Sequence, residues 1–188
     1  MIIFSERLNG MYRDVRTAIA ERNKDVIHQL LMPQLEGGAD VIDINIGPSK
    51  GDPAENFLWL AQTVHERTDK PLSLDSAKAN VLAEAVPRVR EALPDTPLVI
   101  NSCTAAPDYM EKLLPLAVKY RCGIIGLTMD QHGVPGDVEK RVECGAAFLM
   151  AAVEAGIPAE DIYIAPIILP ITAAPKPQIH AVAAIRPL

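Results

Sequence analysis

Six short apolar runs recur along the chain, and polar residues follow most of them directly. The runs begin at Ile2, Val41, Leu72, Leu98, Ile124 and Ile162. Most are separated by a stretch long enough for an amphipathic helix, at intervals of roughly 25–40 residues. This order predicts repeated βα units around a buried parallel sheet. Loops converge at the carboxyl ends of such strands, so the polar tips are expected to carry the chemistry: Asp43, Asn45, Asp75, Asn101 and Asp130.

Composition limits the class of protein. A chain of 188 residues with 49% hydrophobic residues can bury one core. The net charge of −6, without a run of five or more like charges, argues against a nucleic-acid or membrane surface. No leader precedes the first strand, and Cys103, Cys122 and Cys144 lack C-x-x-C spacing. We therefore expect a cytoplasmic protein without a disulfide framework or a bound metal.

Helical spacing and stop signals divide the rest of the chain. Helices are expected over 14–35, 53–67, 78–93, 107–123 and 137–156. We predict one domain over 1–170 and a proline-rich tail over 171–188 that ends in a short helix-like segment. Six parallel strands fit an open doubly wound sheet or part of a (β/α)₈ barrel, which normally needs about 250 residues. A G-x-G-x-x-G motif after the first strand is missing, which disfavours a nucleotide-binding version of the open sheet.

Five motifs in register with the predicted strands carry a family resemblance. They are Ser5-Glu6-Arg7-Leu8-Asn9-Gly10, Ile42-Asp43-Ile44-Asn45-Ile46-Gly47-Pro48, Leu74-Asp75-Ser76, Ile100-Asn101-Ser102 and Gly126-Leu127-Thr128-Met129. Together they resemble the pterin-binding TIM-barrel family. They are most similar to the methyltetrahydrofolate:corrinoid (iron-sulfur) protein methyltransferases and to the folate module of cobalamin-dependent methionine synthase. The resemblance runs from Met1 to about Pro170 and implies an α/β, TIM (β/α)₈-type barrel, truncated here after about six βα units.

The resemblance also assigns roles to the polar tips. A pterin edge offers N–H donors beside carbonyl and ring-nitrogen acceptors, which suit a carboxylate and an amide. Asp75 and Asn101 are therefore implied as catalytic residues on the pterin. The implied substrate-binding set is Glu6, Asn9, Asp43, Asn45, Asp75, Ser76, Asn101 and Met129. Other readings stay open: Asp75 and Asn101 could cap the following helices, and Asp43 and Asn45 could only support loops.

The implied reaction moves the N5 methyl group of methyltetrahydrofolate to a Co(I) corrinoid carried on another protein. Its partners would be a folate-type small molecule, the corrinoid protein and a second copy of the chain or a larger complex. Such an enzyme stabilises charge on N5 and needs no covalent intermediate. Dihydropteroate synthase shares the fold, but the glycine- and serine-rich loops usual after its first two strands do not follow Asn9 or Asn45.

Two departures from the family pattern stand out. Ala165 occupies the position where the family usually has a pterin-binding aspartate, and losing that charged hydrogen bond weakens binding by roughly ten- to a hundredfold. The family's seventh and eighth strands, with an asparagine near N5, would lie beyond Leu188. We therefore expect little or no catalysis by this polypeptide alone. The alternatives are a dihydropteroate synthase, using a pterin pyrophosphate, p-aminobenzoate and Mg²⁺, and a truncated, non-catalytic pterin-binding module.

Overall fold

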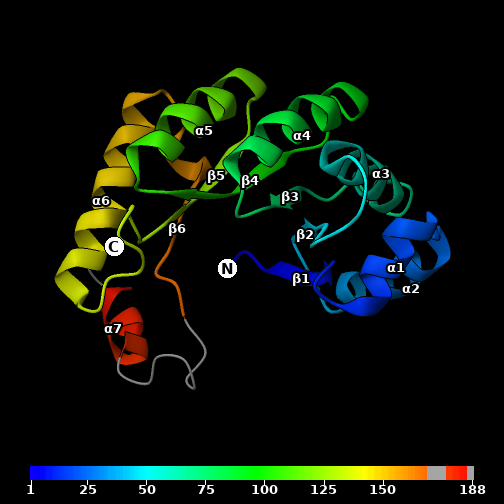
Figure 1. Ribbon diagram of the computed structural model, residues 1–188, viewed down its shortest axis with the longest axis horizontal. Coiled ribbons are helices and arrows are strands. Elements are labelled where there is room, and N and C mark those ends of the chain that lie inside the picture. Colours follow the sequence, from blue (N-terminus) through cyan, green and yellow to red (C-terminus); the bar gives the residue numbers. More distant parts are fainter. Residues whose placement is uncertain (169–176, 186–188) are drawn as a thin grey trace. The chain divides into compact units, whose positions relative to one another are not determined.

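Strands and helices alternate along the chain in the computed structural model, which describes residues 1–168 and 177–185 (Figure 1). They form two compact units, Met1–Asn101 and Ser102–Leu188. The first unit contains β1 (Phe4–Asn9), α1 (Arg13–Glu21), α2 (Lys24–Glu36), β2 (Val41–Asn45), α3 (Pro53–His65), β3 (Leu72–Asp75), α4 (Ala79–Ala92) and most of β4 (Leu98–Thr104). The second contains α5 (Pro107–Tyr120), β5 (Gly123–Leu127), α6 (Val138–Glu154), a 3₁₀ turn (Ala159–Asp161), β6 (Ile162–Ala165) and α7 (Pro177–Ala184). The predicted α/β class is confirmed.

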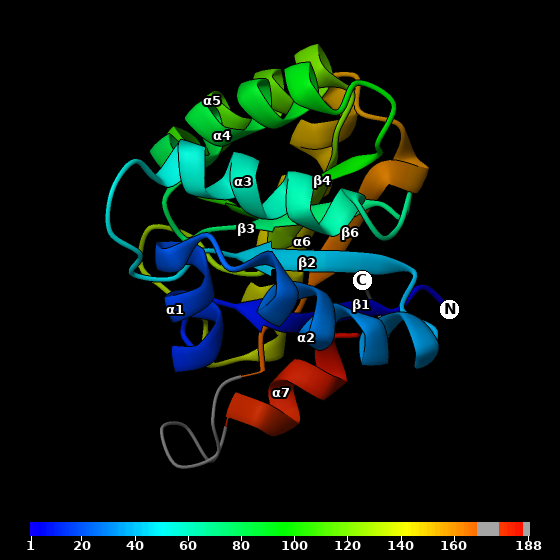
Figure 2. The same cartoon turned by 90° about the vertical axis from the view of Figure 1, so that its right-hand side faces the viewer.

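The strands of the first unit pair in chain order, and every pairing is parallel. Helices α1 to α4 lie along one face of these strands (Figure 2). Side chains alternate between the two faces of a strand, so Ile42 and Ile44, both fully buried, point away from the face that carries Asp43 and Asn45. The apolar half of each strand thus builds the core, and the polar half is left for a site.

In the second unit β5 pairs in parallel with β6, and α6 packs against β5. The close approach depends on Gly126, because a Cβ atom there would lie 2.0 Å from the ring of Phe148. Phe148 is fully buried. The glycine therefore makes room for the largest apolar side chain of α6 to pack directly against the strand.

Two predicted boundaries were wrong. The single helix expected over 14–35 is two helices, because Arg22 adopts a left-handed conformation (φ 55°) and Asn23 starts α2 by accepting a hydrogen bond from the Val26 N–H at 3.4 Å. The first strand begins at Phe4 and includes the polar residues to Asn9. The other expected helices occur with shifted ends. The predicted tail 171–188 overlaps residues 169–176 and 186–188, which lie outside the described part of the chain, and its helix begins at Pro177.

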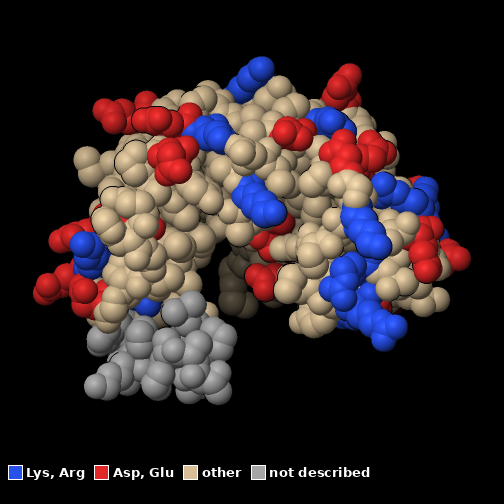
Figure 3. All heavy atoms as spheres, viewed as in Figure 1, with Lys and Arg blue, Asp and Glu red and all other residues tan. Residues whose placement is uncertain are grey.

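Among the described residues, no helix is long and apolar enough to cross a membrane. On the face shown in Figure 3, Lys and Arg side chains are interspersed with Asp and Glu.

The turns after β1 and β2 touch at two glycines, and this contact gives a first prediction. A Cβ atom on Gly10 would lie 2.3 Å from the Ile46 carbonyl oxygen, and one on Gly47 would lie 2.4 Å from the Gly10 carbonyl carbon. Gly10→Ala is expected to lower the free energy of unfolding by about 1–3 kcal/mol, measured by urea denaturation. Gly136→Ala, where nothing lies within 4 Å of the added atom, is the matched control. Equal stability of the two variants would contradict the close contact.

Candidate functional site

Four polar residues form one row across the first unit. Asn9 pairs in register with Asn45, Asn45 with Asp75, and Asp75 with Asn101, at or near the carboxyl ends of β1 to β4. A second, deeper row lies two residues earlier, where Asp43 pairs with Ser73. The structure therefore brings together the strand-tip residues that the sequence singled out in this unit.

Asn45 uses both ends of its amide within the protein. Its Nδ2 donates to Asp75 Oδ2 at 2.6 Å, and its Oδ1 accepts from the Gly47 N–H at 2.7 Å. The Gly10 N–H also donates to the Asn45 carbonyl oxygen at 2.7 Å, which ties the turn after β1 to the same residue. Asn45 thus links Asp75 to the paired glycine turns.

Asp43 lies below this row and is almost completely buried, with 2% of its surface exposed. Its Oδ1 accepts a hydrogen bond from Asn101 Nδ2 at 3.0 Å. Burial raises the pKa of Asp43 to about 7; the Ser73 hydroxyl and the Asn101 amide oppose the rise, and the charges of Asp75 and Glu6 add to it. Near neutral pH the deep row can therefore hold or release a proton.

Asp75 is half-buried and also has a raised pKa. Burial is the main cause, the hydrogen bond from Asn45 opposes it, and the Glu6 charge adds to it. Glu6 is exposed on β1, beside the irregularity in pairing between Ser5 and Leu8. The charges of Glu6, Asp43 and Asp75 therefore affect one another. The described residues include no group of three or more acidic, histidine or cysteine side chains placed to hold a metal.

Two other predicted binding residues serve local turns. Asn9 Oδ1 accepts from the Met11 N–H at 2.9 Å, and Ser76 Oγ accepts from the Lys78 N–H at 3.2 Å. Asp75 and Asn101 make their side-chain hydrogen bonds to Asn45 and Asp43, not to the N–H groups of the helices that follow. Ser76, not Asp75, therefore holds the turn that leads into α4.

Met129 and Ala165 belong to the second unit. Met129 is half-buried just after β5, and its carbonyl oxygen accepts from the Ala105 N–H at 2.8 Å. Ala165 ends β6, and its carbonyl oxygen accepts from the Thr128 N–H at 3.0 Å. The substrate-binding role of Met129 stays a prediction.

Sequence reasoning missed Arg141, the largest side chain that is fully buried. From α6, its Nη1 donates to the carbonyl oxygens of Pro166 and Ile167, the latter at 3.0 Å. Ile167 has a φ of 56°, a strained conformation for a β-branched residue. An arginine directly after Lys140 in a charged part of a helix carries no sequence signal for burial, so only the folded structure identifies it.

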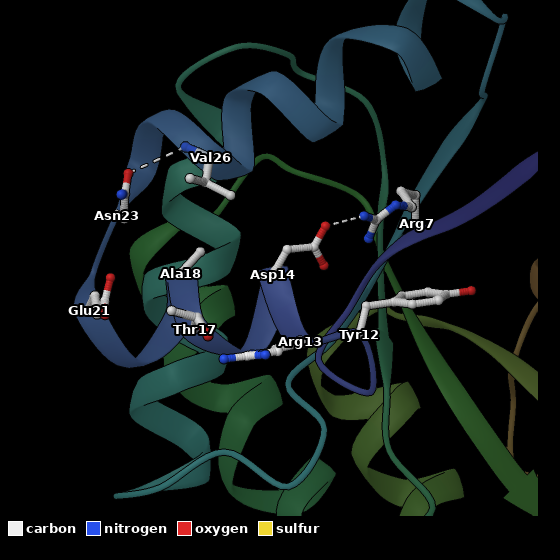
Figure 4. A pocket seen from close by; sticks show the side chains of 9 residues that line it. All are labelled: Arg7, Tyr12, Arg13, Asp14, Thr17, Ala18, Glu21, Asn23 and Val26. Carbon is white, nitrogen blue, oxygen red and sulfur yellow. Dashed lines mark hydrogen bonds and ion pairs between the residues drawn. The ribbon is translucent and has the colours of Figure 1, made fainter.

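A cavity of about 630 Å³ opens on the helix side of the first unit (Figure 4). Arg7 lines it with its guanidinium 4.7 Å from the centre of the Tyr12 ring and paired with Asp14. The other lining residues are Arg13, Thr17, Ala18, Glu21, Asn23 and Val26. None of them belongs to the polar rows, so this cavity is separate from the candidate site.

Cys103 is no candidate for nucleophilic chemistry, because burial raises the pKa of its thiol to about 12.

Residues 12–188 match the family described as pterin binding enzyme. The chain belongs to this family. Over 171 residues it is 29% identical to a methylcorrinoid:tetrahydrofolate methyltransferase of Eubacterium limosum, and the matched part covers 90% of the chain and 61% of that protein. The chain thus spans less than two thirds of the relative's length.

Among solved structures, the fold is similar to that of Yersinia pestis dihydropteroate synthase in complex with a sulfonamide drug. The TM-score is 0.55 at 17% identity, with 87% of this chain and 61% of that chain covered. At this identity the likeness concerns the fold alone, and it confirms the prediction of βα units of the TIM-barrel type. The resemblance to the pterin-binding family that the strand motifs carried is confirmed as well.

Proposed function

We propose that this chain binds the pterin ring of a folate at Asp75 and Asn101. On this proposal it takes part in methyl transfer between N5 of the folate and the cobalt of a corrinoid carried on another protein. The carrying observation is the position of the two side chains, which are register partners at the ends of neighbouring strands. Membership of the pterin-binding family and the name of the methyltransferase relative support the proposal.

The two side chains have free acceptor atoms for a ligand. Asn45 donates to one oxygen of Asp75, and Asn101 donates its amide nitrogen to Asp43. In the described part of the chain, no hydrogen bond reaches Asp75 Oδ1 or Asn101 Oδ1. Two adjacent acceptors fit an edge with two adjacent N–H donors, which a pterin presents at its amino group and the neighbouring ring nitrogen.

The direction of transfer is part of the proposal. The sequence resemblance implied methyltetrahydrofolate as donor, whereas the relative's name makes the methylcorrinoid the donor. Toward cobalt, the metal attacks the methyl carbon, the C–N electron pair stays on N5, and N5 takes a proton. In the reverse direction the N5 lone pair attacks the methyl carbon, the Co–C pair stays on cobalt, and N5 loses its proton. Both directions pass through one transition state, so the same site serves both.

The contribution of the chain would be electrostatic. N5 carries positive charge when it is both methylated and protonated, and a carboxylate beside the ring stabilises that charge. A buried carboxylate does so more strongly than an exposed one, because fewer water molecules screen it. Asp75, half-buried and held by Asn45, is the group that we assign to this task.

Titration calorimetry with methyltetrahydrofolate tests the proposal. We expect micromolar binding by the wild-type chain, weakened about ten- to a hundredfold by Asp75→Ala, because a charged hydrogen bond is lost. Asp69→Ala is the matched control, since Asp69 is exposed and precedes the same strand at its other end. A folded chain that does not bind, or binding that survives Asp75→Ala, would overturn the assignment.

Activity assays separate the proposed transfer from its alternative. Methyl transfer is measured with a corrinoid protein and tetrahydrofolate or methyltetrahydrofolate. Dihydropteroate synthesis is measured with a pterin pyrophosphate, p-aminobenzoate and Mg²⁺. Binding without either activity would favour a non-catalytic pterin-binding module. Dimerisation and a cytoplasmic location stay predictions.

A further inference from the structure

We propose that two residues of β2 are positioning residues. Asp43 orients Asn101 toward the ligand and Asn45 orients Asp75, and neither Asp43 nor Asn45 contacts the ligand itself. The inference rests on the proposed function and narrows it, because the sequence placed all four residues in the substrate-binding set. It also fixes the type of ligand edge that the site accepts.

The two hydrogen-bonded pairs follow from the register. Asn45 and Asp75 lie side by side on neighbouring strands, and the amide reaches across at 2.6 Å. Asp43 and Asn101 are on strands separated by β3, and Asn101 reaches past the Ser73 position to Asp43 at 3.0 Å. Asp75 and Asn101, the two side chains assigned to the ligand, are therefore each hydrogen-bonded to a residue of β2.

The burial of Asp43 and the hydrogen bonds of Asn45 argue against direct contact with a ligand. Asp43 is 2% exposed and lies in the deeper row, below the register row of Asp75 and Asn101. Asn45 already donates to Asp75 and accepts from the Gly47 N–H. Asp43 therefore has no accessible polar atom for a ligand, and the bonds to Asp75 and Gly47 fix the Asn45 amide within the protein.

The Asp43 carboxyl decides which way the Asn101 amide points. An ionised carboxylate only accepts hydrogen bonds, so it selects the nitrogen end of the amide and leaves Asn101 Oδ1 for the ligand. The reverse orientation would present a donor beside Asp75 and would fit a ligand edge of one donor and one acceptor. Asp43 thereby sets the site to recognise two adjacent donors.

The groups around Asp43 make this orientation sensitive to pH. Asp75 and Ser73 of β3, Asn101 of β4 and Glu6 of β1 face it. Its pKa of about 7 means that acid adds a proton to the carboxyl, which can then donate and accept. Selection between the two amide orientations weakens as that proton is added. Ligand binding is therefore expected to weaken below about pH 7, in line with that pKa.

A double-mutant cycle, read by calorimetry with methyltetrahydrofolate, tests the inference. Asp43→Leu removes the acceptor and is expected to weaken binding about tenfold. Asp43→Asn can donate as well as accept, like the protonated carboxyl, so at every pH it should bind with about the affinity that the wild type has below pH 7. In an Asn101→Ala background, Asp43→Leu should change affinity by less than about twofold, since its target is gone. Asn45→Ala combined with Asp75→Ala forms a second cycle that does not depend on the folding of the Asp43 variants.

The outcomes separate this inference from the proposed function. Binding by the wild type that Asp75→Ala abolishes, with additive effects of Asp43→Leu and Asn101→Ala, would overturn the positioning roles alone. An Asp43→Asn variant that binds as tightly as the wild type at pH 8 would also overturn them, because the ionised carboxylate would then not select the orientation of Asn101. No binding by the wild-type chain would overturn both proposals.

Discussion

Replacing Asp43 by asparagine is expected to raise the free energy of unfolding at pH 8 by up to about 4 kcal/mol, although a hydrogen-bonded charge is lost. The carboxyl has an ordinary pKa of 3.8 and a pKa of about 7 in the folded chain. Each pKa unit corresponds to about 1.4 kcal/mol, and desolvation of the charge at 2% exposure is the dominant cause. The asparagine amide avoids that desolvation and can accept from Asn101 while it donates to Ser73.

The sign of the pH dependence follows from which state binds the proton. Between about pH 4 and pH 7 the folded chain keeps the Asp43 proton, whereas the unfolded chain has lost it. The contribution of Asp43 to the free energy of unfolding therefore falls as the pH rises through this window. Asp75, whose pKa is also raised, contributes in the same direction and remains in the variant.

Urea denaturation at several pH values between about 4 and 8 measures this effect. The wild type should lose stability more steeply than Asp43→Asn as the pH rises, and the two curves should converge near the acid end. Asp69→Asn, at an exposed position, should run parallel to the wild type. Parallel curves for the wild type and Asp43→Asn would show that the folded chain does not hold that proton.

A buried carboxyl that destabilises the fold at neutral pH is an argument for function. Packing alone would be better served by the asparagine, which has nearly the same shape. The same substitution is expected to remove the pH dependence of folate binding. Asp43→Asn is thus expected to raise stability and to remove the pH dependence of binding. This contrast distinguishes a positioning role from a purely structural one.

The strand tips could be predicted because two local patterns coincide there. Apolar runs such as Val41–Asn45 alternate with polar residues at a period of two, and helix starts such as Asp52-Pro53 carry their own signal. The structure confirms that start, since Asp52 Oδ1 accepts from the Ala54 N–H at 2.9 Å. Local patterns thus located the elements and the edge where the site lies.

The pairings within the site could not be predicted from the sequence. Whether Asn101 bonds to Asp43 or caps a helix depends on the register of three strands, and alternation alone does not fix that register. The break at Arg22 was missed for a related reason. A non-glycine residue in the left-handed region gives no compositional signal, while the apolar spacing of α1 and α2 reads as continuous.

Arg141→Ala is expected to lower the free energy of unfolding by about 3–4 kcal/mol, the largest loss among the single substitutions considered. Two effects add. The carbonyl oxygens of Pro166 and Ile167 lose the donor that holds them, and the fully buried side chain leaves a cavity against α6. One effect opposes them: burial lowers the pKa of the guanidinium, which shows that its charge is poorly solvated, and Nε and Nη2 have no partner in the described part of the chain.

Arg141→Met separates these effects by urea denaturation. Methionine fills most of the cavity and removes the poorly solvated charge, but it leaves the two carbonyls unpaired, so it should lose about half as much stability as alanine. Lys140→Ala, next along the helix and exposed, should change stability by less than about 0.5 kcal/mol. A methionine variant as unstable as the alanine variant would mean that the hydrogen bonds to the backbone after β6, where Ile167 has its positive φ, dominate. A methionine variant as stable as the wild type would mean that packing dominates and that the buried charge contributes no net stability.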